Sequence, residues 1–120
     1  MPTLLIVDEE HSANRFKEVL EEQGFTCSTA SKAEEAENLL TQQQPNLFLL
    51  DPHLEFGRPV YAEHLDLIQF AQQVSPKTKI CVLCADPGTL SQAKVAGADA
   101  CFDKTVSFGE VLQALKALSP

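Results

Sequence analysis

The sequence predicts an α/β fold in which helices cover both faces of one parallel sheet, the arrangement called doubly wound. Two observations support it. Short apolar segments alternate five times with longer segments whose apolar residues recur at helical spacing. Several of the short segments are apolar throughout, as strands buried on both faces are. Alternating strand and helix units imply parallel strands joined by right-handed crossovers.

The expected strands and the first three helices follow in chain order. The first helix should have Ser12 as its N-cap and end at Gly24. A capping box at residues 31–34 should open the second helix, and the third should end before Pro76. The expected strands are residues 4–7, 25–30, 47–50, 80–84 and 100–102.

The last two helices carry clear start signals. Asp86 followed by Pro87 fits an N-cap with proline in the first helical position, and Gly97 provides a stop. A second capping box at residues 107–110 opens a closing helix with an apolar stripe. Residues 52–60, after the third strand, read as a loop interrupted by proline and glycine.

Composition limits the class of protein. A length of 120 residues fits one domain, and a net charge of −8 opposes direct binding to nucleic acid. No apolar run approaches the roughly 20 residues of a membrane span, so no membrane contact and a cytoplasmic location are expected. The four cysteines lie in apolar segments, which is typical of reduced core thiols, and Cys81-x-x-Cys84 is a weak metal or redox motif on a strand.

Polar residues follow three of the expected strands. Asp8 and Glu9 come after the first strand, Asp51 after the third, and Lys104 shortly after the fifth. Since the loops at the carboxyl edge of a parallel sheet converge on one crevice, these side chains should meet there. Three carboxylates and an ammonium suit a divalent cation and an oxyanion; oxygen ligands favour Mg²⁺, with Mn²⁺ as an alternative.

The motifs Leu5-Ile6-Val7-Asp8-Glu9-Glu10, Leu49-Leu50-Asp51, Gly97-Ala98-Asp99 and Lys104 occur in this order along the chain. In this order and spacing they resemble a response-regulator receiver domain of two-component signalling. The resemblance covers the whole chain and implies a single receiver domain over residues 1–120. It also implies a flavodoxin-like sheet of strand order 2-1-3-4-5.

The resemblance further implies a phosphorelay role. Asp51 would accept a phosphoryl group from a histidine kinase or an acyl phosphate, and Lys104 would pair first with Asp51 and then with the phosphoryl oxygens. Asp8, Glu9, Asp51 and the backbone carbonyl of His53 would hold Mg²⁺. Such a domain is a signalling phosphoacceptor that acts only on itself, not an enzyme with a separate substrate.

Several positions depart from the family pattern, including Glu9, where receivers mostly carry aspartate. Cys84 stands where receivers place the threonine or serine whose hydroxyl binds the phosphoryl group, and a thiol is a poor donor. Cys101 replaces the aromatic that moves with that hydroxyl, and Thr105 replaces a proline after Lys104. The alternative is therefore a degenerate receiver that serves as a phosphorylation-independent interaction module.

The implied partners are a histidine kinase or phosphotransfer protein and an output protein or effector domain, with a homodimer left open. A flavin carrier on the same fold is disfavoured because residues 8–10 place three acids where a flavin phosphate would bind. A haloacid-dehalogenase-like phosphatase would need an aspartate at position 53, where the chain has histidine.

Overall fold

The computed structural model describes residues 2–52, 54–55, 58–59 and 61–120, with side chains described for 2–52 and 65–120. Its main sheet has five parallel strands in the order β2-β1-β3-β6-β7, which confirms the expected order 2-1-3-4-5. The strands are β1 (Thr3–Val7), β2 (Thr26–Ala30), β3 (Leu47–Leu50), β6 (Lys79–Leu83) and β7 (Ala100–Phe102).

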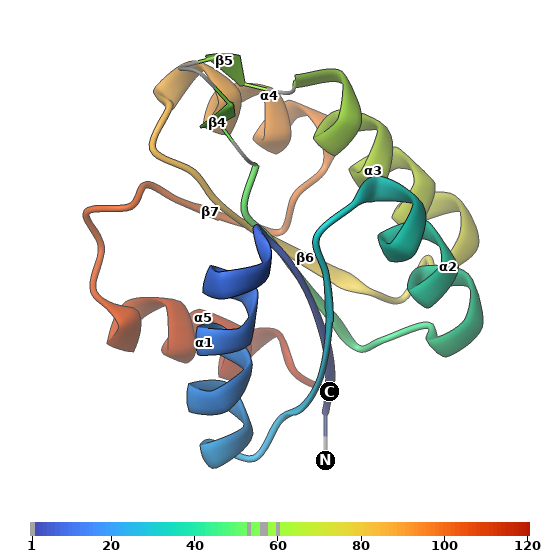
Figure 1. The fold of residues 1–120 in the computed structure, drawn as a ribbon, viewed down its shortest axis with the longest axis vertical. Helices are drawn as coiled ribbons and strands as arrows, with labels where there is room; N and C mark the ends of the chain where they lie inside the picture. Colours follow the sequence, from blue (N-terminus) through green and yellow to red (C-terminus); the bar gives the residue numbers. More distant parts are fainter. Residues whose placement is uncertain (1, 53, 56–57, 60) are drawn as a thin grey trace.

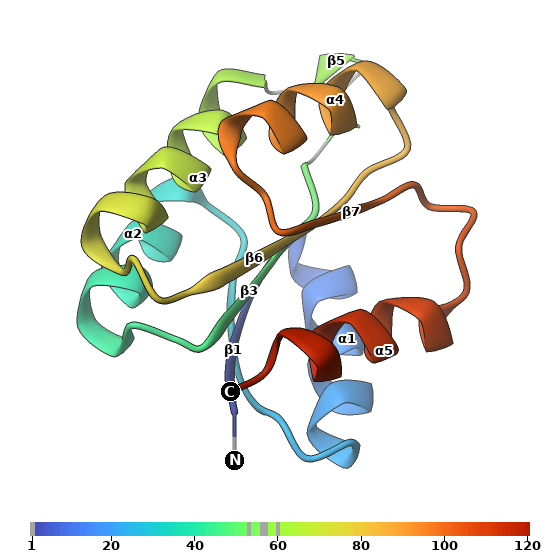
Figure 2. The same cartoon turned by 180° about the vertical axis from the view of Figure 1, so that it is seen from behind.

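Helices cover both faces of this sheet (Figures 1 and 2). One face carries α1 (Glu10–Glu22) and α5 (Phe108–Leu118), and the other carries α2 (Ala33–Gln43), α3 (Tyr61–Val74) and α4 (Pro87–Ala96). The chain is therefore doubly wound as predicted. This arrangement leaves the carboxyl ends of β1 and β3 open between the two helical layers, where the sheet order reverses.

Alternation along the central strands builds a separate core on each face. In β1, Leu5 and Val7 belong to the core beneath α2, α3 and α4, whereas Leu4 and Ile6 belong to the core beneath α1 and α5. Successive strand side chains point to opposite faces, so an all-apolar strand fills both cores at once. Phe48 in β3 is fully buried. These contacts hold the strand ends, and the residues that follow them, in a fixed frame.

Two helix starts differ from the predictions. The N-cap of α1 is Glu9 rather than Ser12, because the Glu9 carboxylate accepts a hydrogen bond from the Ser12 amide at 2.6 Å and the helix begins two residues before Ser12. The capping box at 31–34 does not form: Lys32 occupies the N-cap of α2 without a side-chain cap bond, and the Ser31 hydroxyl contacts Glu35 instead.

The other helix signals hold. The Asp86 carboxylate caps α4 by accepting from the Thr89 amide at 3.0 Å, and the Ser107 hydroxyl caps α5 by accepting from the Glu110 amide at 3.2 Å. Gly97 ends α4 with φ +111°, and a Cβ there would collide with the Gln72 side-chain amide. Glycine is therefore favoured here by the backbone conformation, whereas the Gln72 amide lies at the end of a flexible side chain that can move aside.

The segment after β3 is not simply a loop. Leu54–Glu55 (β4) and Arg58–Pro59 (β5) pair as a two-stranded antiparallel sheet, which the sequence did not predict. Proline and glycine obscure such a short ladder in the sequence, although the local pairing supplies partners for backbone polar groups. This small sheet lies next to the carboxyl edge of the main sheet (Figure 1).

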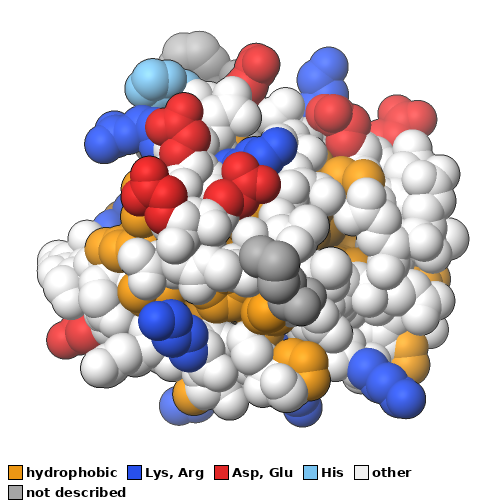
Figure 3. All heavy atoms as spheres, turned by 90° about the horizontal axis from the view of Figure 1, so that it is seen from below, with side chains coloured by type: hydrophobic (Ala, Val, Ile, Leu, Met, Phe, Trp, Pro, Cys, Tyr) orange, Lys and Arg blue, Asp and Glu red, His pale blue; other side chains and the backbone are white. Residues whose placement is uncertain are grey.

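Acidic side chains are prominent on the surface. On the face in Figure 3 several gather close together, with Lys and Arg side chains beside them, in keeping with the net charge of −8. Across the described ranges, no helix is both long and apolar enough to cross a membrane.

Candidate functional site

The register of the central strands brings Asp8 and Asp51 together. Val7 is opposite Leu50, so the two aspartates follow paired positions of β1 and β3. Backbone bonds extend the ladder past both strand ends: the Asp51 amide donates to the Val7 carbonyl at 2.8 Å, and the Asp8 amide donates to the Ala30 carbonyl at 3.2 Å. The acids are thus positioned by the sheet itself.

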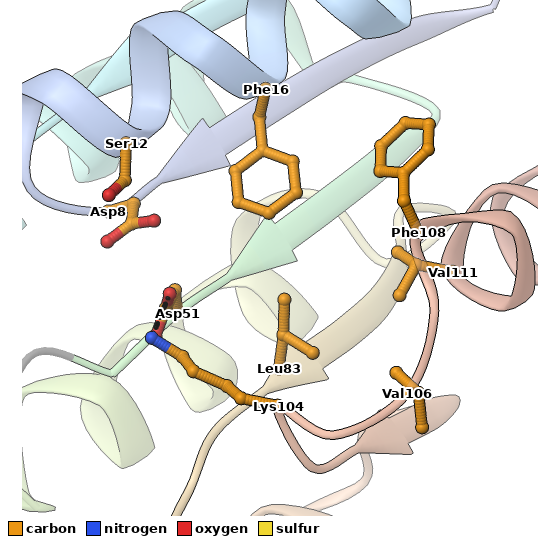
Figure 4. A pocket seen from close by; sticks show the side chains of 9 residues that line it. All are labelled: Asp8, Ser12, Phe16, Asp51, Leu83, Lys104, Val106, Phe108 and Val111. Carbon is orange, nitrogen blue, oxygen red and sulfur yellow. Dashed lines mark ion pairs between the residues drawn. The ribbon is translucent and has the colours of Figure 1, made fainter.

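Lys104 completes the cluster from the loop after β7. Its Nζ lies 2.7 Å from Asp51 Oδ2, so the ammonium and the carboxylate form an ion pair (Figure 4). The Lys104 side chain is about half exposed, whereas that of Asp51 is only 6% exposed. The positive charge therefore reaches a nearly buried carboxylate from the solvent side.

Two carboxylate oxygens in this cluster lack partners. Asp8 Oδ2 and Asp51 Oδ1 are buried and have no hydrogen-bond partner among the described residues. Asp8 Oδ1 accepts from the Glu9 amide at 2.7 Å, and Asp51 Oδ2 is held by Lys104. Buried polar atoms are rarely left unpaired in folded proteins. These two oxygens are therefore suited to a cation or a donor group.

The charge distribution changes the ionisation of the cluster. Burial, and next the negative charge of Asp51, raise the pKa of Asp8 to about 7. Partial burial lowers the pKa of Lys104, but its hydrogen bond to Asp51 and the charges of Asp51 and Asp8 outweigh that effect and leave this pKa above its usual value. Without a cation, the site is thus short of positive charge at neutral pH.

A tight turn presents Lys104 to the crevice. The Asp103 carboxylate accepts hydrogen bonds from the Thr105 amide, at 2.8 Å, and from the Thr105 hydroxyl. These bonds lower the pKa of Asp103. Proline has no N–H, so a proline at position 105 could not donate the backbone hydrogen bond to Asp103. Thr105 thus anchors this loop through both its amide and its hydroxyl.

The remaining expected metal ligands are less well defined. Glu9 directs Oε1 to the Ser12 amide, so its carboxylate serves as the helix cap in this structure. His53, whose backbone carbonyl was expected to bind the metal, lies outside the described residues. Within the described ranges, no group of three histidine, cysteine or acidic side chains is arranged to hold a metal. Asp8 and Asp51 still fit Mg²⁺, which is often bound through one or two carboxylates, with water and phosphate supplying its other ligands.

Comparison with known proteins agrees with this geometry. The family model of the response regulator receiver domain matches residues 4–116. The chain belongs to this family. Receiver domains are signalling domains rather than enzymes in the ordinary sense, as expected. No curated protein sequence matches the chain significantly.

Solved structures of receivers share the fold. A CheY-like receiver from Methanospirillum hungatei has 24% identity and a TM-score of 0.82, over 98% of this chain and 92% of that one. Response regulator TrrA from Thermotoga maritima, in complex with Mg²⁺-BeF, has 27% identity and a TM-score of 0.81, over 98% and 99%. A Burkholderia pseudomallei response regulator with a phosphorylated aspartic acid and a calcium ion has 25% identity and a TM-score of 0.78, over 98% and 74%.

The cysteines of this receiver domain point to different cores. Cys81 belongs to the core beneath α1 and α5, whereas Cys84 and Cys101 lie on the opposite face of the sheet. The Cys81-x-x-Cys84 pair is therefore split by the sheet and cannot act as one metal knuckle. Burial, and next the neighbouring Cys101, raise the pKa of Cys81 to about 12, so its thiol is protonated and inert.

Cys84 and Cys101, which the sequence predicted at the receiver switch positions, are both free thiols. Cys84 is fully buried, and its sulfur accepts a hydrogen bond from the Asp86 amide at 3.4 Å. Its own amide donates to the Phe102 carbonyl at 3.0 Å, one residue beyond Cys101. The Cys84 thiol is thus held at the base of the loop that leads into α4.

Several residues that line the site were not predicted to belong to it. Ser12 lies beside Asp8 in the first turn of α1, and apolar side chains from α1, β6 and the α5 region continue the same cavity (Figure 4). The sequence predicted Ser12 only as a helix cap and did not assign Phe16 to the site. The signal that identifies them is the Glu9 cap, because it places Ser12 and Phe16 successively along the helix edge that borders the acids.

We expect Mg²⁺ to raise the melting temperature of the parent protein by about 4 to 7 °C when its concentration is about ten times the Kd. Glu9→Ala should lower stability without metal, because α1 loses its cap, and should also reduce the shift caused by Mg²⁺. Thermal unfolding in EDTA and in Mg²⁺ measures both effects. The exposed neighbour Glu10→Ala is the control; an equal reduction in that variant would show a general charge effect.

Proposed function

We propose that residues 1–120 form a single receiver domain that accepts a phosphoryl group on Asp51 and passes the resulting change to an output protein or effector domain. The donor is a histidine kinase, a phosphotransfer protein or a small acyl phosphate. The observation that carries the proposal is the nearly buried Asp51, paired through Oδ2 with Lys104 while its Oδ1 and the neighbouring Asp8 Oδ2 have no partner among the described residues.

The two oxygens of Asp51 have different roles in this proposal. Oδ1, which has no partner among the described residues, is available to a cation, whereas Oδ2, beside Lys104, attacks phosphorus. The ammonium then offsets the charge that develops on the phosphoryl oxygens. A carboxylate is a weak nucleophile, so positioning and charge stabilisation supply most of the rate.

Mg²⁺ is the proposed cofactor, and Mn²⁺ is an alternative with similar ligand preferences. Asp8 and Asp51 would hold it, with Glu9 through its second oxygen or a bridging water and with the His53 carbonyl as further ligands. The bound cation would screen the repulsion between the carboxylates and the incoming phosphate. TrrA with Mg²⁺-BeF and the phosphorylated Burkholderia regulator support this assignment, because each holds a cation in a related fold.

Incubation with acetyl phosphate and Mg²⁺, followed by intact mass spectrometry, tests the proposal. The parent should gain one phosphoryl group, and Asp51→Asn should gain none. Asp66→Asn is the matched control, because it removes an exposed aspartate of α3 outside the crevice. A parent that gains no phosphoryl group, or an Asp51→Asn variant that gains as much as the parent, would contradict the assignment.

A second candidate is a degenerate receiver whose output does not depend on phosphorylation. The specific observation in its favour is Cys84, whose buried sulfur already accepts a bond from the Asp86 amide and offers only a weak S–H donor. Phosphorylation of Asp51 without any change at α4 and β7 would favour this candidate.

We expect Cys84→Ser to enlarge the structural response to phosphorylation. A hydroxyl can donate a full hydrogen bond to a phosphoryl oxygen, whereas the thiol does so poorly. Amide chemical-shift changes on adding beryllofluoride and Mg²⁺ should grow about twofold or more over α4 and β7, and Cys27→Ser, remote from the crevice, should leave them unchanged. Equal responses in parent and Cys84→Ser would show that the thiol does not limit the switch.

A cytoplasmic setting is part of the proposal. Four cysteines without disulfide bonds, all within the described residues, agree with a reducing compartment.

Gel filtration with and without beryllofluoride would show whether activation is coupled to a homodimer.

A further inference from the structure

The cavity that contains Asp51 has two chemically different ends. It has a volume of about 280 Å³, and its polar end is formed by Asp8, Ser12, Asp51 and Lys104. Its other end is apolar and extends between α1 and α5 (Figure 4). The apolar walls are Phe16, Leu83, Val106, Phe108 and Val111.

Adjoining cavities indicate how a ligand would lie. A polar cavity of about 190 Å³ shares Asp8, Asp51 and Lys104 with the first and continues toward Pro52 and Ala85. An outer groove shares Phe16 and Phe108 with the first cavity. The acids thus have polar space on one side and apolar space on the other.

The apolar end is accessible rather than sealed core. Phe108 is 37% exposed, and Phe16 is half-buried. Their ring centroids lie 6.4 Å apart with the planes tilted by 31°, so the two rings form an aromatic edge to the cavity. Apolar surface left open beside a charged site can bind a ligand that carries both characters.

We propose that this cavity selects small acyl phosphates whose acyl group carries a large apolar substituent, such as the phenyl ring of benzoyl phosphate. The inference rests on the proposed phosphorylation of Asp51. The phosphoryl group occupies the polar end beside Lys104, and the acyl group lies against Phe16, Val106 and Phe108. The cavity volume of about 280 Å³ is at the small end for a ligand site, so the occupant is a small molecule.

The reaction needs no further reactant. Asp51 Oδ2 forms a bond to phosphorus while the bond between phosphorus and the acyl oxygen breaks. The leaving carboxylate takes the bonding electron pair and departs as benzoate when the donor is benzoyl phosphate. No proton is transferred, because Asp51 attacks as a carboxylate and the acyl group leaves as a carboxylate.

The apolar contacts give a measurable preference. Burial of part of a phenyl ring at roughly 25 cal/mol per Å² predicts that benzoyl phosphate reacts about tenfold faster than acetyl phosphate at equal low concentration. Intact mass spectrometry, with Mg²⁺ and either donor, measures both rates. Phe108→Ala and, separately, Val106→Ala should each lower the ratio of the two rates about threefold or more.

Val95→Ala is the control, because Val95 is an exposed apolar residue of α4 outside the cavity, and its ratio should equal that of the parent. A parent ratio near one, or a ratio that both cavity variants leave unchanged, would overturn the inference. A parent ratio near one would mean that the apolar side chains do not contact a small donor, and would favour a macromolecular donor for this surface. If neither donor modifies Asp51 the proposed function itself fails, whereas equal rates with both donors reject only the selectivity.

Discussion

Asp8→Asn is expected to stabilise the metal-free protein at pH 8 and to remove most of its response to Mg²⁺. Asp8 is 7% exposed, and its Oδ2 has no partner among the described residues. Asparagine keeps the shape, removes a charge that faces Asp51, and leaves a cation with one carboxylate fewer. Phosphorylation from acetyl phosphate should fall about 100-fold or more, because positioned charge dominates phosphoryl transfer.

The stability of the metal-free protein should decrease as the pH rises. Burial and the charge of Asp51 raise the pKa of Asp8 in the folded protein to about 7 from its ordinary value of 3.8. A carboxyl group whose pKa is raised on folding contributes stability that is fully present below its pKa in the unfolded chain. This stability is lost as the pH rises through its pKa in the folded protein. The free energy of unfolding of the metal-free parent should therefore fall by roughly 1 to 2 kcal/mol between pH 5 and pH 8, after allowance for solvent screening at the cavity mouth.

Urea unfolding at pH 5 and pH 8, in EDTA and in Mg²⁺, measures this effect. The parent should show the loss in EDTA and recover part of it in Mg²⁺, whereas Asp8→Asn should show neither change. Asp66→Asn should behave like the parent. If Asp8→Asn loses as much stability as the parent over this range, the titrating group lies elsewhere.

Lys104→Ala should have the second largest effect, on stability and on signalling together. Its ammonium is the partner of Asp51, and its loss leaves a nearly buried carboxylate beside Asp8 without compensation. Removing one partner of a fully buried pair costs about 3 to 5 kcal/mol; since Lys104 is half exposed, a loss of roughly 1 to 2 kcal/mol is expected. Phosphorylation should remain detectable, but its structural response should be blunted.

A double-mutant cycle isolates this interaction. In the Asp51→Asn background, Lys104→Ala should cost much less, because the carboxylate that pairs with Lys104 is then already absent. Lys116→Ala, an exposed lysine of α5, is the control. Chemical shifts with beryllofluoride and Mg²⁺ report the response over β7 and α4. Equal stability losses in the two backgrounds, together with equal shift changes in parent and Lys104→Ala, would mean that Lys104 does not act through Asp51.

Periodicity and residue order predicted the frame of the site. Apolar runs at 4–7, 47–50 and 80–84 identified buried parallel strands, and resemblance to receivers supplied the strand order later found in the sheet. Because parallel strands end at the same edge of a sheet, the sequence also predicted that Asp8, Asp51 and Lys104 lie close together. Such patterns reflect which residues of a short segment are buried, so they can be recognised without knowledge of the tertiary contacts.

Contacts between elements decided the rest. Only the folded chain shows that Glu9 caps α1, that Lys104 holds one oxygen of Asp51 and leaves the other unpaired, and that the sheet separates Cys81 from Cys84. The apolar end of the cavity likewise arises where Phe16 and Phe108, 92 positions apart in the sequence, come to 6.4 Å. Side-chain partners depend on distances of a few ångströms between segments remote in the chain, and such distances are set by the packing of helices on the sheet rather than by any local pattern.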